Sequence, residues 1–551
     1  MTIPNPATAL VSPLYALRQR AVWQGFVGSL CLLVGSFSPG YLPDSVPPQR
    51  WLVALGIAGA PARYVGTALL MVGLLLLATA WLALRPRDVE SPSAGGSAVG
   101  TTIIPGLTVT KLLVIWCLPL LFAAPLFSTD AYSYAAQGWL WHNDINPYDV
   151  GPGTLPGAFA DNVAWVWRWT RAPYGPFAIE INYWLVVLCR FHPALTAWLM
   201  RLPALVGVAL LAHCLPRIAK QRNLNVPLVT WFGVLNPLVL VNFVGGAHND
   251  SLMVGLMVAG LWVAGIKPSS GQQPNVAQRQ TLYAWLLGAA LVGLAAAVKQ
   301  PAALAVVALP FIAYPIRRWT SHTLFVSVGR VLVSLVVATG VFALVSVVTG
   351  LGFGWVFAVD VPGRIITVAP FTLLGNLLAW LAVSFDAPQL AATAVFWSRT
   401  FGLMLAAVAV LVLGWRRLPR HPYAFVSYGL LWFVFCSPAL HPWYVQWGGT
   451  LLPLAVRRTG MRLSIWATLT VLGFHAVLAG LRGGALPLGI ATCFGLLAII
   501  LLCYEAKLKE KPNLSLLSSP LLSSPLLAGK RYSAGFVACF ARCAYTPVCQ
   551  Q

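Results

Sequence analysis

The chain has 551 residues, of which 59% are apolar and only 9% are charged. This composition excludes an ordinary soluble globular protein and predicts an all-α polytopic membrane protein. The formal net charge is +22, but the lysines and arginines form short clusters between apolar runs. That distribution indicates membrane topology and no nucleic-acid partner.

The first apolar run extends from Ala21 to Phe37 and follows Arg18 and Arg20. A basic segment before an apolar run also begins a secretory signal peptide, but no small-residue cleavage site follows this run convincingly. We therefore expect an uncleaved first membrane helix.

Apolar windows of about 19 residues predict the spanning helices in chain order. The fourteen predicted spans are residues 21–38, 62–84, 107–127, 195–216, 226–244, 251–266, 281–298, 301–316, 323–349, 396–414, 422–439, 443–456, 464–480 and 485–503. An even number of spans places both termini on one side of the membrane. Two further apolar stretches, 177–188 and 369–385, are predicted to be interfacial or re-entrant helices within the external segments 128–194 and 350–395.

The positive charges fix the predicted orientation. With the two ambiguous stretches on the outer surface, 10 of the 35 lysines and arginines are external, which leaves 25 on the cytoplasmic side. If 177–188 spanned the membrane, the next three basic clusters would be external, so we reject that topology. The sequence therefore predicts a multi-pass plasma membrane protein with cytoplasmic termini and with most of its carboxylates outside.

The C-terminal segment 512–551 changes to serine, leucine and proline, with a repeated Leu-Ser-Ser-Pro motif. This composition predicts a disordered cytoplasmic tail. Cysteines elsewhere lie mostly inside apolar runs, without the paired spacing of a zinc site or a disulfide framework. The tail cysteines Cys539, Cys543 and Cys549 could bind a metal or carry a lipid, although no function is the more economical interpretation.

The first candidate site is Asp130, which directly follows the apolar run 107–127, with Tyr132, Tyr134 and Gln137 shortly after it. A carboxylate at a membrane boundary is costly, and burial can raise its pKa so that it acts as a general base. The alternative is a helix N-cap, because Ser-Thr-Asp is also a favourable capping sequence.

The external loop after Asp130 is rich in aromatic residues and ends in Ala-Pro-Tyr-Gly-Pro, which contains Tyr174. Its tryptophans are Trp139, Trp141, Trp165, Trp167 and Trp169. Indole rings stack on sugar faces, but they also anchor proteins at the lipid headgroups. Arg168 and Arg171 beside these rings could bind a lipid phosphate or extend toward the headgroups.

The turn Gly-Gly-Ala-His-Asn-Asp carries His248, Asn249 and Asp250 between two apolar runs. Three consecutive hydrogen-bonding side chains exceed what a turn needs, which favours a role in a site. His248 and Asp250 could also bind a metal, but no third ligand is identified, so we predict no metal site.

Two further groups lie between apolar runs: Lys299, and the sequence His-Pro-Trp-Tyr with His441, Trp443 and Tyr444. A lysine between apolar segments needs a partner, and a phosphate would be suitable. Extension of the lysine toward the interface is the alternative. His441 could equally be a structural, hydrogen-bonded histidine.

Taken together, the motifs at 128–138, 146–152, 172–176, 235–240 and 245–250 resemble a known family. They are similar to the actinobacterial α-1,6-mannosyltransferases of the MptA/MptB type, which belong to the GT-C class of membrane glycosyltransferases. The resemblance covers about residues 20–505. Asp250 stands where we expect glutamate in the family, which shortens the reach of that carboxylate.

The resemblance implies a GT-C-type bundle of about fourteen transmembrane helices over residues 1–511. It also implies transfer of mannose from polyprenyl-phosphate-mannose to a lipid-anchored α-1,6-mannan acceptor of the lipomannan and lipoarabinomannan core, on the periplasmic face. Asp130 would be the general base of an inverting reaction. The leaving phosphate would be held by Lys299, Arg364 or the Arg168 and Arg171 pair.

No metal or other cofactor is required by this chemistry, because a lipid phosphate is already a good leaving group. The partners would be the two lipid-linked substrates and the membrane lipids. A transporter or flippase of a lipid-linked sugar, or an envelope scaffold, would also be polytopic. We favour an enzyme because the sequence lacks a convincing internal repeat and its polar groups gather at the outer helix ends.

Overall fold

The computed structural model describes residues 6–38, 42–43, 46–86, 102–104, 107–358, 361–364, 367–456 and 458–509. The side chains of 6–17, 102–104, 362, 364, 458–459 and 500–509 are outside this description. The chain divides into two compact units, 1–500 and 501–551. The predicted tail 512–551 lies outside the described residues.

Three helices begin the chain, and the first and third of them pack against each other. They are α1 (Pro6–Ser36), α2 (Pro47–Ala54) and α3 (Ala60–Ala83), followed by the short antiparallel strands β1 (Thr102–Ile104) and β2 (Leu107–Thr108) and by α4 (Val109–Leu120). α1 contacts both α3 and α4. A Cβ at Gly73 would lie 2.8 Å from the Gly28 carbonyl oxygen, so glycine permits the close approach of α1 and α3.

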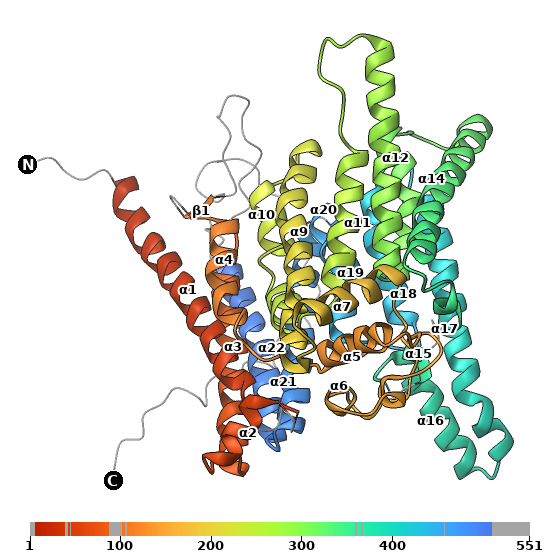
Figure 1. Cartoon of the computed structure of the whole chain (residues 1–551). Coiled ribbons are helices and arrows are strands. Elements are labelled where there is room, and N and C mark those ends of the chain that lie inside the picture. Colours follow the sequence, from red (N-terminus) through yellow and green to blue (C-terminus); the bar gives the residue numbers. More distant parts are fainter. Residues whose placement is uncertain are drawn as a thin grey trace, which may run out of the picture. The chain divides into compact units, whose positions relative to one another are not determined.

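The segment after α4 contains short helices. They are α5 (Asp130–His142), the 3₁₀ turn η1 (Pro152–Thr154), α6 (Ala158–Asp161), α7 (Pro176–Leu188) and α8 (Pro193–Leu199). In Figure 1, α5 and α7 run crosswise to the long helices α9 and α12, and α5 packs against α7 and α8. A 13-residue helix such as α7 is about 20 Å long, which is shorter than a bilayer core of about 30 Å.

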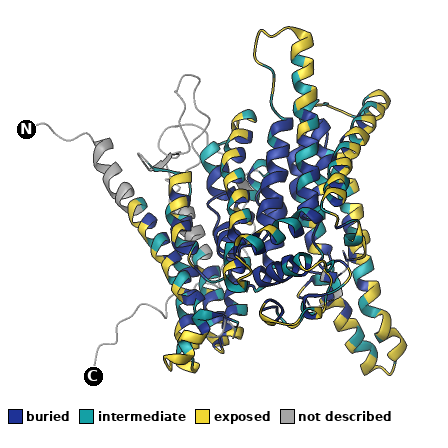
Figure 2. Ribbon diagram, in the orientation of Figure 1, coloured by how far each residue is buried: buried dark blue, intermediate teal, exposed yellow. Residues whose placement is uncertain are grey.

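The centre of the first unit is built around α11. The elements here are α9 (Arg201–Gln221), α10 (Val226–Gly233), the π-helix η2 (Val239–Gly245), α11 (Asp250–Ala264), α12 (Pro274–Val298), the 3₁₀ helix η3 (Gln300–Ala308) and α13 (Leu309–Ala313). α11 contacts α9 and α12 and is almost entirely buried (Figure 2). A Cβ at Gly255 would lie 2.6 Å from Cα of Gly207, which explains the close packing.

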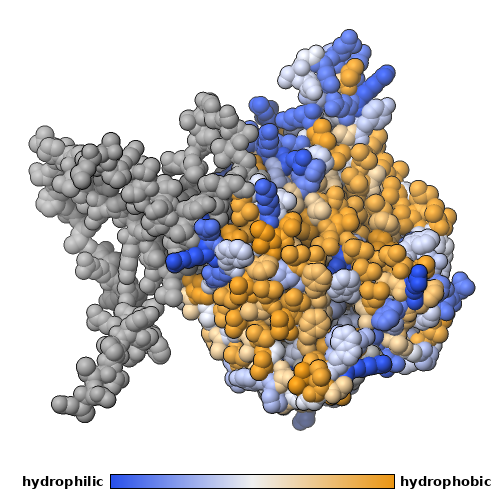
Figure 3. Space-filling model, turned by 60° about the vertical axis from the view of Figure 1, so that its left-hand side comes forward, coloured by the Kyte–Doolittle hydropathy of each residue, from blue (hydrophilic) through white to orange (hydrophobic). Residues whose placement is uncertain are grey.

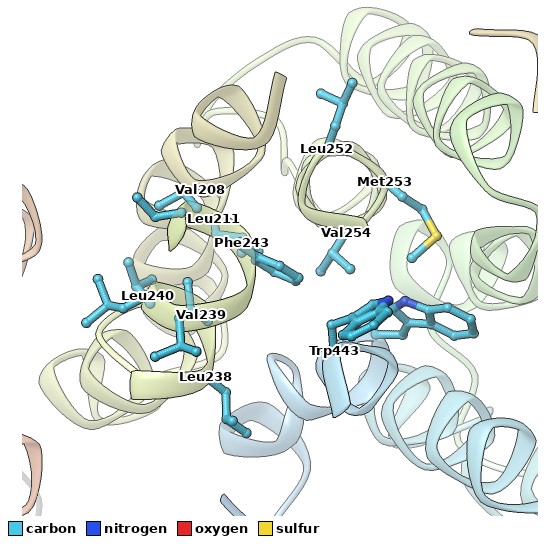
Figure 4. Packing of buried hydrophobic residues seen from close by; sticks show 14 of the residues in the cluster. Val208, Leu211, Leu238, Val239, Leu240, Phe243, Leu252, Met253, Val254 and Trp443 are labelled. Carbon is cyan, nitrogen blue, oxygen red and sulfur yellow. The ribbon is translucent and has the colours of Figure 1, made fainter. Parts of the chain in front are cut away.

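The buried cluster around these helices is apolar. Figure 4 shows Val208 and Leu211 of α9 beside Phe243 of η2, with Val254 of α11 and the Trp443 ring in the same cluster. The ends of η2 and α11 that carry the candidate site residues are therefore fixed by a packed core.

The remaining helices complete the chain. They are α14 (Ser321–Val348), η4 (Gly354–Phe357), α15 (Val361–Arg364), α16 (Pro370–Ser384), α17 (Pro388–Arg417), α18 (Pro422–Cys436), η5 (Pro442–Val445), α19 (Gln446–Gly449), α20 (Leu452–Ala455), α21 (Arg458–Arg482) and α22 (Leu486–Lys509). α16 packs along α17, and α21 packs against α3.

Six helical segments among the described residues are long and apolar enough to cross a membrane. They are Ala60–Ala83, Pro193–Gln221, Pro274–Val298, Ser321–Val348, Pro388–Arg417 and Gly460–Arg482. α14 and α17 expose most of their apolar side chains (Figure 2), and hydrophobic residues cover much of the face in Figure 3. Exposed apolar helices of this length are suited to lipid, so the chain is a polytopic integral membrane protein.

Several predicted spans are not continuous helices, which corrects the sequence-based boundaries. The predicted span 226–244 is divided into α10 and η2 because Pro237 disfavours helix at the preceding residue, and Asn236 Oδ1 accepts a hydrogen bond from the Leu238 amide. The predicted span 443–456 is divided into η5, α19 and α20, with prolines at the starts of η5 and α20. The predicted span 301–316 is divided into the 3₁₀ helix η3 and the short α-helix α13.

Candidate active site

Asp130 is held at the start of α5 by an unusual turn. Phe127 has φ of +58°, Thr129 is the helix cap, and the Asp130 amide donates a hydrogen bond to Ser128 Oγ at 3.1 Å. Asp130 is thus the first residue of the helix. The N-cap is Thr129, whereas the alternative interpretation of the sequence made Asp130 the cap. Its carboxylate remains available for other contacts.

The carboxylate of Asp130 faces the turn before α11. His248 Nδ1 lies 3.7 Å from Asp130 Oδ2 and 3.4 Å from the Tyr134 hydroxyl. Ala247 has φ of +54°, and this turn brings His248 back toward α5. Because Nδ1 faces a carboxylate, we assign the imidazole proton to Nδ1. His248 therefore directs an N–H toward Asp130.

Stacked aromatic rings support this imidazole from the C-terminal half of the chain. The centroids of His248 and Trp443 are 3.9 Å apart, and those of Trp443 and His441 are 4.8 Å apart. Trp167 of the external loop approaches His441 with a centroid distance of 6.3 Å. A series of aromatic rings thus extends from His248, beside Asp130, toward the tryptophan-rich loop.

Lys299 and Asp250 form a buried ion pair. Lys299 Nζ donates to Asp250 Oδ1 at 2.9 Å, and Trp447 Nε1 donates to the same oxygen at 2.5 Å. The Lys299 ammonium also lies 4.4 Å from the ring centroid of Tyr444 and 5.4 Å from that of Tyr174. Asp250 and cation–π contacts thus compensate the charge of this lysine.

The electrostatic environment separates the roles of the titratable groups. Burial raises the pKa of Asp130 to about 6, although the charges of Lys299 and Arg482 oppose that increase. Burial, together with the charge of Lys299, lowers the pKa of His248 well below 6.5 and that of His441 to about 3. At neutral pH, Asp130 is therefore ionised and both imidazoles are neutral.

Arg201 joins the two turns that carry Asp130 and His248. Its buried guanidinium donates to the carbonyl oxygens of Val244 at 3.1 Å, Gly245 at 3.0 Å and Ala123. The Leu126 amide also donates to the Gly245 carbonyl oxygen at 3.0 Å. These bonds satisfy backbone acceptors at the end of η2 and fix the distance between the two turns.

Most of the predicted site residues come together at this place. The assembled set is Asp130, Tyr134, Tyr174, His248, Asp250, Lys299, His441, Trp443 and Tyr444. Asn249 instead lines a small pocket with Tyr134 and Asn182, and both side-chain polar atoms of Asn249 lack a partner among the described residues. Within the described part of the chain, this pocket offers the unpartnered amide of Asn249 and the unpartnered Nδ2 of Asn182 beside apolar side chains.

Other predicted residues lie apart or are not described in detail. Tyr132 is buried within charge range of Arg201, and Gln137 is buried with an unpartnered Oε1 among the described residues. Arg364 ends α15, but its side chain is outside the description. Arg168 lies 3.7 Å from Asp161 within the loop.

Sequence reasoning missed three residues. Trp447 binds Asp250, Arg201 links the two turns, and Arg482 Nη1 donates to the Phe127 carbonyl oxygen at 2.9 Å. The signal was present for Arg201, because an arginine inside an apolar helix needs partners. Trp447 follows Tyr444 by three residues and Arg482 follows an apolar run, but neither position indicates its partner from the sequence alone.

The described residues contain no group of three or more histidine, cysteine, aspartate or glutamate side chains that could hold a metal ion. Asp250 is already bound by Lys299 and Trp447. What the arrangement offers is one ionised carboxylate, neutral imidazoles and phenols, and aromatic surfaces. Such a set can accept a proton and bind a sugar.

Comparisons with known proteins agree on one family. Residues 22–318 match the MptA_B family, described as "Alpha-(1->6)-mannopyranosyltransferase, N-terminal domain". Alpha-(1->6)-mannopyranosyltransferase A of Mycobacterium tuberculosis is 32% identical over 443 residues, 78% of either chain. Alpha-(1->6)-mannopyranosyltransferase B of Corynebacterium glutamicum is 26% identical over 484 residues, 84% of this chain and 77% of the relative.

No solved structure matches the chain. The family match covers more than half of the sequence and includes α5, the turn before α11 and Lys299. The resemblance inferred from the motifs is thereby confirmed. The chain belongs to the α-(1→6)-mannopyranosyltransferase family of MptA and MptB and is a glycosyltransferase.

Proposed function

We propose that the enzyme transfers mannose from polyprenyl-phosphate-mannose to a lipid-anchored α-1,6-mannan of the lipomannan and lipoarabinomannan core. The main support is the buried Asp130 carboxylate, which lies 3.7 Å from neutral His248 and within charge range of Lys299. The names of the relatives support the sugar and the linkage. A membrane-embedded protein is suited to substrates that carry lipid chains.

In the proposed reaction, Asp130 is the general base. Its carboxylate accepts the proton of the acceptor 6-hydroxyl while the acceptor oxygen forms a bond to the anomeric carbon of the donor mannose. The bond between that carbon and the phosphate oxygen breaks, and its electron pair leaves with the polyprenyl phosphate. Attack opposite the leaving group inverts the configuration at the anomeric carbon.

His248 and the aromatic rings would organise this step. The Nδ1–H of His248 lies 3.7 Å from the Asp130 carboxylate and would help to orient it. Trp443 fixes the imidazole by stacking. The amide of Asn249 and the Nδ2 of Asn182, which are unpartnered among the residues described, are suitable partners for sugar hydroxyls, which both donate and accept hydrogen bonds.

A donor assay tests the proposed substrate. Membranes that contain the protein are supplied with a mannan acceptor and with radiolabelled mannose on either polyprenyl phosphate or a nucleotide. We expect transfer from the lipid-linked donor, with release of polyprenyl phosphate, and none from the nucleotide donor when lipid-donor synthesis is blocked. Transfer from the nucleotide donor under that block would contradict the proposed donor.

We also propose that Asp130 faces the periplasm. Trp169 lies in the loop after α5 with 70% of its surface exposed, and Arg217 lies near the C-terminal end of α9, whose first residue is Arg201. In intact cells, a membrane-impermeant maleimide should label the Trp169→Cys variant above the wild-type background but not the Arg217→Cys variant. The reverse labelling pattern would place the site in the cytoplasm.

A further inference from the structure

The donor phosphate needs a cation near Asp130, and the expected cations whose side chains the structure describes are either paired with a carboxylate or lie within the external loop. Lys299 is bound to Asp250 at 2.9 Å, and its side chain is 7% exposed. Arg168 lies against Asp161, and Arg171 donates to the Asp149 carbonyl oxygen within the loop, and neither is among the charges that shift the pKa of Asp130. A different cation is therefore better placed to meet a phosphate.

Arg482, the last residue of α21, lies beside the Asp130 turn. Its Nη1 donates to the carbonyl oxygen of Phe127, three residues before Asp130. Burial raises the pKa of the Asp130 carboxyl, and the charge of Arg482 is among the groups that oppose this increase. Among the described residues, Lys299 and Arg482 are the two cations that have this effect.

The guanidinium of Arg482 has capacity for another ligand. The residue is exposed, and no ion pair joins it to a carboxylate in the part of the chain that the structure describes. A guanidinium has five N–H donors, arranged to bind phosphate oxygens in pairs. One N–H holds the Phe127 carbonyl oxygen, which leaves the others for an anion.

Packing fixes the position of this arginine. A Cβ at Gly483, the next residue, would collide with Thr67 of α3, so the end of α21 lies tightly on that helix. The Phe127 carbonyl oxygen holds the side chain from the other direction. The cation is thus held in advance beside the turn that carries the base, which reduces the entropy lost when a ligand binds.

We propose that Arg482 binds the phosphate of the lipid-linked donor and stabilises it as the leaving group. This assignment rests on the proposed function and adds a residue to it. Negative charge increases on the phosphate during transfer while Asp130 loses its charge, so a cation near both groups is stabilising throughout the reaction. Lys299 then pairs with Asp250 and contacts the surrounding aromatic rings, and it does not bind the phosphate.

Binding of a short-chain, water-soluble prenyl phosphate tests the assignment without requiring activity. The purified protein in a phosphate-free detergent is titrated with this probe, and its thermal unfolding midpoint is recorded. We expect the probe to stabilise the wild type and Asp130→Asn, with an affinity about 10-fold to 100-fold weaker for Arg482→Gln. Arg482→Lys should retain part of the affinity because it keeps the charge.

The matched control is Arg217→Gln. Arg217 is also exposed and also donates one hydrogen bond from Nη1 to a backbone carbonyl oxygen, that of His213. It lies near the C-terminal end of α9, whereas Arg201 of the site begins that helix. The control should bind the probe as the wild type does.

Kinetics with a water-soluble donor and a lipid-free mannoside acceptor give a second readout. Arg482→Gln should lower kcat/KM for the donor by about 10-fold to 100-fold and leave the acceptor KM unchanged. Equal probe affinity in wild type and Arg482→Gln would overturn the assignment. If the wild type and Arg482→Gln differed in probe affinity only after anionic phospholipid is added, the assignment would also be overturned. Arg482 would then bind a headgroup phosphate.

These results are distinguishable from a failure of the proposed mechanism. Near-normal transfer by Asp130→Asn would show that Asp130 is not the base. The probe affinities of the Arg482 variants would be unaffected by that result. Loss of probe binding in Arg482→Gln, with a normal unfolding midpoint in the absence of probe, would still support the phosphate contact.

Discussion

Asp130→Asn is expected to lower mannosyl transfer by about 10²-fold to 10⁴-fold, which is the usual contribution of a positioned general base. Asparagine keeps the size of the side chain but cannot accept the hydroxyl proton. The carboxylate is suited to the task because burial raises its pKa to about 6 and His248 lies 3.7 Å away. Transfer to a mannan acceptor in isolated membranes measures the loss.

Asp161→Asn is the matched control for this prediction. Asp161 belongs to the same external segment, but its side chain is 60% exposed and lies 3.7 Å from Arg168. Solvent-exposed ion pairs contribute little, so this variant should keep nearly full activity. If Asp130→Asn were as active as Asp161→Asn, Asp130 would not be the base.

The second large effect is a loss of stability, which we expect when one residue of the buried ion pair between Asp250 and Lys299 is replaced. Lys299→Met leaves the Asp250 carboxylate buried with only the N–H of Trp447 as a donor. Removal of one member of a buried ion pair costs about 3–5 kcal/mol, so we expect a large loss of thermal stability. Asp250→Asn should be costly for the converse reason, because Lys299 loses its counter-charge.

The double variant Asp250→Asn with Lys299→Met distinguishes a pair from two independent residues. Without either charge, most of the desolvation cost disappears, so the double variant should be more stable than Lys299→Met alone. Thermal unfolding of detergent-solubilised protein measures all three variants. If the stability lost in the double variant equalled the sum of the losses in the two single variants, the two charges would not interact.

The apolar pattern predicted where many helices lie but not how they are interrupted. α14 and α17 were predictable because long apolar runs without internal proline determine them. Asn236-Pro237 ends the regular helix before η2, and the break helps to place the turn that carries His248. A hydropathy window averages over such breaks, so it joined α10 and η2 into one span.

The individual site residues were predictable, but their partners were not. Asp130 and His248 each stand out as polar groups at the ends of apolar runs, and a resemblance to known motifs supports both. Their contact depends on tertiary packing between segments more than 100 residues apart, as in the Tyr134–His248 contact at a separation of 114 residues. The hydrogen bond from Trp447 to Asp250 joins residues 197 positions apart.

The buried pairing of Lys299 also changes its interpretation. From the sequence, an isolated lysine between apolar runs indicated either a phosphate contact or extension toward the interface, because no partner was apparent nearby. The structure places Asp250 at 2.9 Å, so the charge already has a protein partner. Local sequence shows that a buried charge needs a partner but does not show which residue provides it.

The most direct test of the central claim is the pH dependence of kcat/KM for the wild-type enzyme. A base must be ionised, and the pKa of Asp130 is raised from 3.8 to about 6, so activity should fall as the pH decreases through about 6. The residual activity of Asp130→Asn should lack this acidic limb. A wild-type profile that stays flat from about pH 7.5 down to pH 5, or a limb that persists in Asp130→Asn, would contradict Asp130 as the base.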